Sequence, residues 1–199
     1  MYKVKKMGYV CTHTKGIVIR KNSSFVHESK NWVIWRTTIT LNTCEYCFLY
    51  NGKILSIRSL NAVSLPVHPN CKCRLDPLPV IYAGSATKLG GDGVDAYVAD
   101  NGVLPQNYLT KEDAWRLGWV GREGNLADVL PGKLIGGNQY FNWDGRLPSS
   151  PGRVWFEADF DYTGGFRNDC RLLFSSDGLL FVTYDHYLTF YEIEIGGTT

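Results

Sequence analysis

Residues 153–160 read Arg153-Val-Trp-Phe-Glu-Ala-Asp-Phe160, a segment in which two kinds of side chain alternate. Successive side chains of a β-strand point to opposite faces of the sheet. One face of this segment is therefore apolar and carries Val154, Phe156, Ala158 and Phe160. The other face carries Trp155, Glu157 and Asp159, so two carboxylates stand next to an aromatic ring. The alternation predicts a strand of an antiparallel sheet.

The segments on either side of this strand indicate the fold class. Residues 171–175, 179–183 and 188–195 have strand character and are separated by short turns. Upstream, Val94, Tyr97 and Val98 lie at helical spacing, and residues 110–113 resemble a capping box. Residues 125–130 predict a further short helix that ends at Pro131-Gly132. Helices followed by antiparallel strands predict an α+β fold over residues 93–199.

The N-terminal part has a different character. Residues 16–20, 32–35 and 37–41 predict strands, and Asn51-Gly52 predicts a hairpin between residues 48–50 and 53–55. Residues 76–92 are punctuated by proline and glycine and predict a linker. The expected organisation is a basic, β-rich module at 1–75, the linker, and the α+β domain at 93–199.

The charge distribution supports this division. The 199 residues carry a net charge of +2, but residues 1–89 hold 13 Lys and Arg against 3 Asp and Glu, a charge of +10. The remaining 8 basic and 16 acidic residues give residues 90–199 a charge of −8. No run approaches the ~20 apolar residues of a membrane span. The N-terminus does not resemble a Sec signal peptide, so we expect a cytoplasmic chain until export by a non-Sec route.

Two short motifs predict a metal site in the module. Cys44-Glu-Tyr-Cys47 is followed after 20 residues by His68-Pro-Asn-Cys71-Lys-Cys73. Structural zinc binds four thiolate or imidazole ligands in a tetrahedron, and five candidates are present. The spacing favours Cys44, Cys47, Cys71 and Cys73, with His68 as the rival ligand. Reduced thiols without metal, or adventitious disulfides, are the alternatives.

A set of catalytic side chains is found in the α+β domain. Glu157 lies on the polar strand face, Arg167 and Arg171 follow, His186 lies near the C-terminus, and Lys111 begins a helix. Cleavage of RNA through its 2′-hydroxyl needs a base, an acid and cations that stabilise the phosphorane-like charge. Each residue also has an ordinary structural interpretation, such as a solvated carboxylate or an ion pair. Spacing alone therefore leaves the function open.

A resemblance decides between these interpretations. Residues 93–195 resemble the barnase-type bacterial guanyl-preferring ribonucleases. The matching stretches include Leu104-Pro-Gln-Asn-Tyr-Leu-Thr-Lys111, Trp155-Phe-Glu-Ala-Asp159, Tyr162-Thr-Gly-Gly-Phe-Arg-Asn168 and Asp185-His-Tyr187. The resemblance implies the microbial ribonuclease fold and metal-independent cleavage of single-stranded RNA to a 2′,3′-cyclic phosphate. It implies Glu157 as base, His186 as acid, and Lys111, Arg167 and Arg171 as phosphate contacts. It further implies Tyr187 as a substrate neighbour, Asp159 as the partner of the two arginines, and an Arg153–Asp177 pair.

The base-recognition loop departs from the family pattern. It reads Tyr140-Phe-Asn-Trp-Asp-Gly145, with Tyr140, Asn142, Trp143 and Asp144 expected to contact the base. Asp144 stands where the family has glutamate, and Trp143 stands where it has arginine. Trp143 can stack on a base but cannot pair with phosphate. We therefore expect a guanine preference that is weakened or altered.

A second resemblance covers residues 35–75, which are similar to the cysteine motif of phage minor head (head-morphogenesis) proteins. Together the two resemblances imply a toxin effector, delivered to a target cell and held in check by a barstar-like inhibitor protein. The +10 module could hold RNA for the −8 domain or dock on that acidic domain, and the alternative is that its lysines form an ordinary solvated surface. The alternative function is a phage-derived, zinc-containing structural or adaptor protein whose ribonuclease-like domain only binds. Its full catalytic set argues against that alternative.

Overall fold

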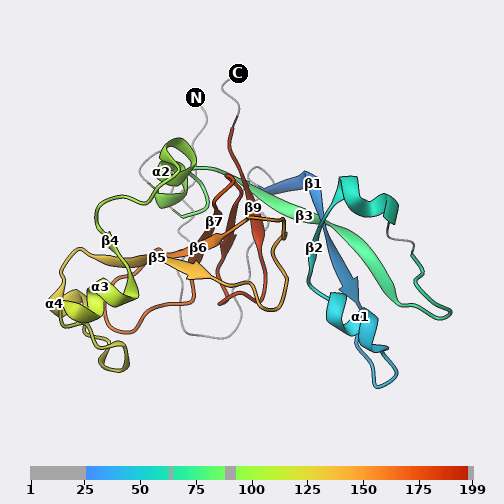
Figure 1. The fold of residues 1–199 in the computed structure, drawn as a ribbon, viewed down its shortest axis with the longest axis horizontal. Helices are drawn as coiled ribbons and strands as arrows, with labels where there is room; N and C mark the ends of the chain where they lie inside the picture. Colours follow the sequence, from blue (N-terminus) through green and yellow to red (C-terminus); the bar gives the residue numbers. More distant parts are fainter. Residues whose placement is uncertain (1–25, 63–64, 88–92, 197–199) are drawn as a thin grey trace, which may run out of the picture.

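The computed structural model describes residues 26–62, 65–87 and 93–196 of the chain, which form one extended sheet with short helices at its ends (Figure 1). The sheet has nine strands in the order β2-β1-β3-β9-β8-β7-β6-β5-β4. Neighbouring strands are antiparallel except β3 with β9 and β4 with β5. The α+β class expected for residues 93–199 agrees with this mixed architecture. None of the helices in the described ranges is long and apolar enough to cross a membrane.

The C-terminal half begins with helices and ends with an antiparallel meander. Its helices are α2 (Val94–Asn101), α3 (Lys111–Arg116), the 3-10 turn η2 (Gly121–Glu123) and α4 (Leu126–Val129). Its strands are β4 (Tyr108–Leu109), β5 (Leu134–Tyr140), β6 (Trp155–Asp159), β7 (Arg171–Ser175), β8 (Leu180–Thr183) and β9 (Tyr191–Glu194). Thr110 is confirmed as the N-cap of α3, because its side chain accepts the N–H of Asp113 at 3.1 Å.

The predicted alternation of residues 153–160 is also confirmed. Ala158 and Phe160 are buried in a cluster that includes Val98 of α2 and Leu172 of β7. Trp155 points to the other face and packs in a second cluster. Each face of β6 is thus covered, and Glu157 lies on the Trp155 side with only 5% of its surface exposed.

The N-terminal half contains β1 (Val26–Thr37), α1 (Glu45–Tyr50), β2 (Ile54–Ser56), η1 (Ile57–Ala62) and β3 (Cys73–Tyr82). The expected strand at residues 32–35 is the end of β1. The expected strand at 37–41 is wrong beyond Thr37, and the strand expected at 48–50 is the end of helix α1. Tyr46 and Tyr50 stack with ring centroids 4.4 Å apart, a contact between positions i and i+4 that a helix allows. The strand expected at 16–20 lies outside the described residues.

The expected linker begins inside β3, since its residues 76–82 belong to that strand. β3 pairs in parallel with β9, with Val80 opposite Glu192. Ile34 and Ile54 of the module, with Leu78 of β3, share a buried cluster with Leu173 and Phe181 of the C-terminal half. The charge break therefore does not separate two bodies, because the described parts of both halves share one sheet and a buried cluster. The module contacts the loop that follows β5, because the N–H of Ile54 donates to the carbonyl of Arg146 at 2.8 Å.

Candidate active site

A cavity of about 450 Å³ collects the residues predicted for catalysis and base recognition. It is lined by Lys111 at the start of α3, by Glu157 and Arg171 of β6 and β7, and by Arg167 before β7. The loop after β5 and the turn after β8 complete it. Its full lining is Lys111, Gln139, Tyr140, Phe141, Asn142, Trp143, Asp144, Glu157, Arg167, Arg171, His186 and Tyr187. All ten predicted site residues outside the module thus meet at one cavity.

Glu157 is held by two donors at the floor of the cavity. Its Oε1 lies 2.5 Å from Lys111 Nζ, and its Oε2 accepts a hydrogen bond from the hydroxyl of Tyr187. Burial acts to raise the pKa of Glu157, but these hydrogen bonds and the charges of Lys111 and Arg167 outweigh it. The pKa therefore lies below its ordinary value, and the carboxylate is ionised at neutral pH. An ionised carboxylate can accept a proton from a substrate hydroxyl.

Asp159 fixes the two arginines. Its carboxylate is 1% exposed and lies 2.6 Å from Arg167 Nε and 3.0 Å from Arg171 Nε. Arg171 is further held by the backbone carbonyls of Asn168 and Cys170, at 2.6 and 2.7 Å. The expected role of Asp159 is confirmed, as is the Arg153–Asp177 pair, which closes at 2.7 Å. Two guanidinium groups are therefore oriented towards the cavity before any substrate arrives.

His186 lies at an exposed turn between β8 and β9. It adopts a left-handed backbone with φ of 53°, and Tyr187 follows with φ of 69°. The turn is held by the Asp185 carboxylate, which accepts the N–H and hydroxyl of Thr189 at 2.8 and 2.6 Å. The backbone N–H of His186 donates to the backbone carbonyl of Asp169 at 3.1 Å. The strained turn thus presents an imidazole to solvent at the rim of the cavity.

The loop expected to recognise the base has two aromatic surfaces and one carboxylate. Tyr140 stacks on Tyr187 with centroids 5.0 Å apart, and burial raises the pKa of Tyr140 to about 12. Phe141 stacks on Trp143 at 5.3 Å, and Trp143 is 89% exposed. Asn142 holds the loop closed, because its side chain exchanges two hydrogen bonds with the backbone of Leu147, at 2.8 and 3.0 Å.

Three residues near the cavity were not found by sequence reasoning. Asn138 Oδ1 accepts the backbone N–H of Lys111 at 2.8 Å and so fixes the start of α3. Arg146 binds Asp144, with Nε 3.0 Å from Oδ2. Lys53 of the module lies beside the recognition loop, since a Cβ at Gly145 would lie 3.6 Å from its Nζ. The contacts of Asn138 and Lys53 join segments far apart in the chain, and no local pattern signals them.

The five predicted metal ligands of the module also come together. His68 Nε2 lies 3.2 Å from both Cys44 Sγ and Cys47 Sγ, and Cys47 Sγ lies 3.9 Å from Cys71 Sγ. Cys73 groups with Cys47 and Cys71 but also donates to Thr37 Oγ1 at 3.2 Å. In a tetrahedral zinc site with bonds of ~2.0–2.3 Å, ligand atoms lie roughly 3.3–3.8 Å apart. The described donors form two triads that share Cys47, namely Cys44-Cys47-His68 and Cys47-Cys71-Cys73. Each triad supplies thiolate or imidazole groups of the kind that zinc binds.

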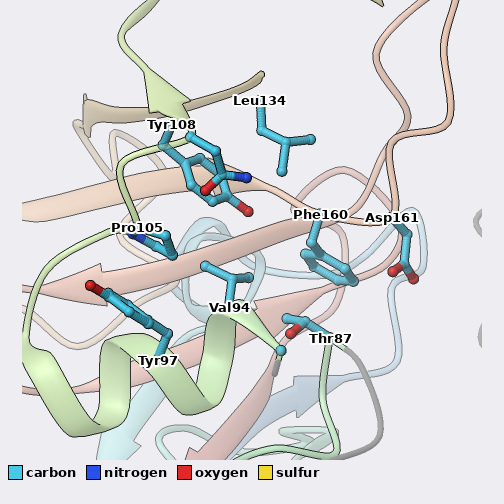
Figure 2. Close-up of a pocket in the computed structure, with 10 residues that line it drawn as sticks. Thr87, Val94, Tyr97, Pro105, Tyr108, Leu134, Phe160 and Asp161 are labelled. Atoms are coloured by element: carbon cyan, nitrogen blue, oxygen red, sulfur yellow. The ribbon is translucent and has the colours of Figure 1, made fainter. Parts of the chain in front are cut away.

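A separate cavity of about 360 Å³ lies between α2 and the segment before β4 (Figure 2). Tyr97, Pro105 and Tyr108 face it, together with Phe160 and Asp161. Burial, aided by the charge of Asp95, raises the pKa of Asp161 to about 6. None of the predicted site residues lines this cavity, so the candidate active site is the one around Glu157.

An ionised carboxylate, an exposed imidazole and a frame of fixed cations around one cavity define an acid–base site for a phosphodiester substrate. The comparisons with known proteins agree. The family model described as ribonuclease matches residues 92–194. Over 102 residues the chain is 55% identical to "Ribonuclease" of Heyndrickxia coagulans, and this match covers 51% of this chain and 94% of the relative. "Ribonuclease" proteins of Bacillus intermedius and Bacillus pumilus are also 55% identical over 102 residues, which span 63% of each. The chain belongs to the ribonuclease family, and the resemblance to barnase-type ribonucleases is confirmed.

Proposed function

We propose that the chain is an endoribonuclease that cleaves single-stranded RNA by attack of a 2′-hydroxyl on the adjacent phosphorus, with a preference for guanine. The observation that carries the proposal is the position of Glu157. It is buried, kept ionised by Lys111 and Tyr187, and shares its cavity with His186 and two arginines. Membership of the ribonuclease family supports RNA as the substrate.

In the proposed reaction Glu157 accepts the proton of the 2′-hydroxyl while O2′ forms a bond to phosphorus. The bond from phosphorus to O5′ of the next nucleotide breaks, and His186 donates a proton to that leaving oxygen. The products are a 2′,3′-cyclic phosphate and a free 5′-hydroxyl. Lys111, Arg167 and Arg171 stabilise the charge that builds up on the phosphoryl oxygens. Each proton has a donor and an acceptor among these side chains, so the step needs no cofactor.

The guanine preference is assigned to Asp144, because a carboxylate can accept the two N–H donors on the guanine edge. Tyr187 and Tyr140 form a stacked pair that lines the cavity, and Trp143, which also lines it, is largely exposed. Stacking on an aromatic ring tolerates every base. The preference should therefore rest on Asp144, with stacking contributing affinity.

The activity is tested with a DNA oligonucleotide that contains a single riboguanosine, and with matched substrates that contain riboadenosine or deoxyguanosine at that position. The proposal expects one cut, on the 3′ side of the riboguanosine, with a 2′,3′-cyclic phosphate end. The deoxyguanosine control lacks the nucleophile and should stay intact. Cleavage of that control, or a product without the cyclic phosphate, would contradict the mechanism.

For the module we propose a structural zinc ion bound by Cys44, Cys47, His68 and Cys71. His68 Nδ1 donates to the carbonyl of Pro69 at 2.8 Å, which leaves Nε2 free to bind a metal. Cys73 is the less favoured fifth candidate, because it is engaged with Thr37. Metal analysis of purified protein should find one zinc per chain, and cobalt substitution should give the absorption bands of a tetrahedral thiolate site. In Cys47→Ser both signals should be lost, whereas an unchanged zinc content would contradict the assignment.

In its biological setting we propose a toxin effector that is delivered to a target cell and neutralised by a barstar-like inhibitor. An enzyme that cuts RNA without a cofactor endangers the cell that makes it, which supports the expectation of an inhibitor. The retained set of Lys111, Glu157, Arg167, Arg171 and His186 speaks for an active enzyme over an adaptor that only binds. Co-expression with candidate inhibitors encoded beside the chain, scored by growth, tests this assignment.

A further inference from the structure

Arg146 contacts three parts of the molecule that are separate in the chain. Its Nε lies 3.0 Å from Asp144 Oδ2 in the recognition loop. Its Nη1 donates to the carbonyls of Tyr187 and Leu188, at 3.0 and 2.9 Å, in the turn that carries His186. Its own carbonyl accepts the N–H of Ile54, at 2.8 Å, from strand β2 of the module. One residue thus joins base recognition, the catalytic acid and the N-terminal module.

The guanidinium group suits this position. It is planar and presents five N–H donors in fixed directions, so it can bind a carboxylate and two carbonyls at once. Tyr187 has a left-handed backbone, and regular sheet pairing cannot satisfy the carbonyls of that turn. The side chain of Arg146 is 30% exposed, which leaves part of it shielded from competing water. Arg146 therefore sets the spacing between the recognition loop and the His186 turn.

The same contacts fix the direction of the Asp144 carboxylate. Oδ2 meets Arg146 Nε, and Oδ1 accepts the backbone N–H of Arg146 at 3.3 Å. Each carboxylate oxygen has further lone-pair positions, so both can still accept a donor from a ligand. Guanine presents two adjacent N–H donors on its edge, whereas adenine presents an acceptor at the corresponding ring nitrogen. A fixed carboxylate distinguishes these edges better than a freely rotating one.

The support from the module is specific to this chain's N-terminal half. Ile54 is buried in the cluster shared by both halves, so its N–H is held in place. Gly52 lies directly against the guanidinium, since a Cβ there would be 3.7 Å from Arg146 Nε. Both residues lie outside the 92–194 segment that matches the ribonuclease family. The loop in this chain therefore has an anchor that the matched segment alone does not contain.

We propose that Arg146 is a positioning residue that sets the base preference of the enzyme, and that the N-terminal module is part of the base-recognition structure through its contact with Arg146. The inference rests on the proposed ribonuclease activity. Arg146 acts through Asp144 and the His186 turn and need not touch the substrate. Its loss should therefore change discrimination between bases and not only the overall rate.

The test measures kcat and KM for the dinucleotides GpU and ApU with wild type, Arg146→Ala, Arg146→Lys and the exposed control Arg122→Ala. Loss of one oriented base contact corresponds to about a tenfold fall in the GpU:ApU ratio of kcat/KM. We expect that fall in Arg146→Ala, a smaller one in Arg146→Lys, and an unchanged ratio in Arg122→Ala. A purely structural role predicts equal losses on both substrates. That result, or a wild type that does not distinguish the bases, would overturn the proposal.

Equilibrium binding of guanosine 3′-monophosphate and adenosine 3′-monophosphate provides a readout that is independent of turnover. The ratio of the two dissociation constants should shift in Arg146→Ala in the same direction as the kinetic ratio. If the wild type cuts neither dinucleotide, the proposed activity fails, and the binding ratio still decides the role of Arg146.

The module's share is tested with Gly52→Ala, which strains a turn with φ of 87° next to Arg146. This variant replaces no residue that lines the cavity. Its GpU:ApU ratio should fall, by less than in Arg146→Ala. An unchanged ratio would remove the module from the recognition structure.

Discussion

The ammonium group of Lys111 lies 2.5 Å from Oε1 of Glu157 and joins the first turn of α3 to the centre of β6. Glu157 is buried, which by itself would favour the protonated carboxyl. The contact with Lys111, together with the hydroxyl of Tyr187, reverses that preference. A group placed to take a proton is therefore kept in the state that can accept one.

Lys111→Ala should move the acidic limb of the pH profile. Without Lys111, Glu157 loses a hydrogen bond and a positive charge that lower its pKa, so this pKa rises relative to that of the wild type. The base is ionised only above its pKa, and the acidic limb of kcat/KM, which reports the free enzyme, should shift to higher pH. Loss of a charged group that stabilises the phosphoryl oxygens should also lower kcat by roughly 10²–10³-fold.

Lys133→Ala is the matched control, because Lys133 contacts the carbonyl of Gln106 and does not line the cavity. Its profile should coincide with that of the wild type. An acidic limb that stays in place in Lys111→Ala would show that Lys111 does not control the ionisation of Glu157.

The Arg153–Asp177 pair should contribute stability that depends on pH. Hydrogen bonds from Arg153 and Ser175 lower the pKa of Asp177 to about 2. The ordinary pKa of aspartate is ~3.9, so the contribution is complete above that value and disappears as the pH falls towards 2. Because Asp177 is largely exposed, we expect Asp177→Asn to cost only about 0.5–1 kcal/mol at pH 7.

Urea unfolding of Asp177→Asn, Arg153→Gln and the double variant measures this contribution. The coupling energy of the cycle should be present at pH 7 and shrink below pH ~4. A coupling energy of equal size at both pH values would contradict an ionic origin.

Gly136→Ala should destabilise the protein through crowding. A Cβ at this position would lie 2.6 Å from Cδ1 of Tyr108 and 2.9 Å from Cβ of Ala158. Tyr108 cannot easily move, because its hydroxyl donates to the carbonyl of Asp159 at 2.7 Å. Overpacking of this kind costs about 1–3 kcal/mol. Gly196→Ala is the control for thermal unfolding, because a Cβ there would meet no atom within 4 Å among the described residues. Equal unfolding temperatures for the two variants would refute the prediction.

Trp143→Ala should weaken substrate binding. The indole stacks on Phe141, lines the cavity and is 89% exposed, so a base can stack on it. Removing a stacking platform costs about 1–3 kcal/mol per base, so KM should rise by roughly 5–150-fold while kcat changes little. Trp115→Ala removes a comparably exposed tryptophan outside the cavity and should leave KM as it is. If both variants have the same KM, Trp143 does not stack on substrate.

The sequence predicts the C-terminal half well, because its signals are local. Alternation in residues 153–160 places Glu157 and Trp155 on one face, and Thr110 caps a helix as its neighbours indicate. The strand at 171–175 is reproduced residue for residue as β7.

The module is harder to predict, because competing local signals coexist there. Asn51-Gly52 is typical of a hairpin, yet Cys44 caps a helix by accepting the N–H of Cys47. The stacked Tyr46–Tyr50 pair then stabilises that helix up to the turn. The contacts of Arg146 with the turn that carries His186 could not be predicted, since Tyr187 and Leu188 lie 41 and 42 residues further along the chain.

The central claim is tested most directly by cleavage of a short single-stranded RNA in EDTA by wild type, Glu157→Gln and His186→Gln, with folding checked by circular dichroism. Both substitutions introduce a neutral polar side chain of similar size, so the cavity should stay intact. The account predicts that the wild type cuts without free metal, and that each variant, though folded, loses at least about 10²-fold in kcat. Folded variants that cut as fast as the wild type would contradict the assignment of base and acid.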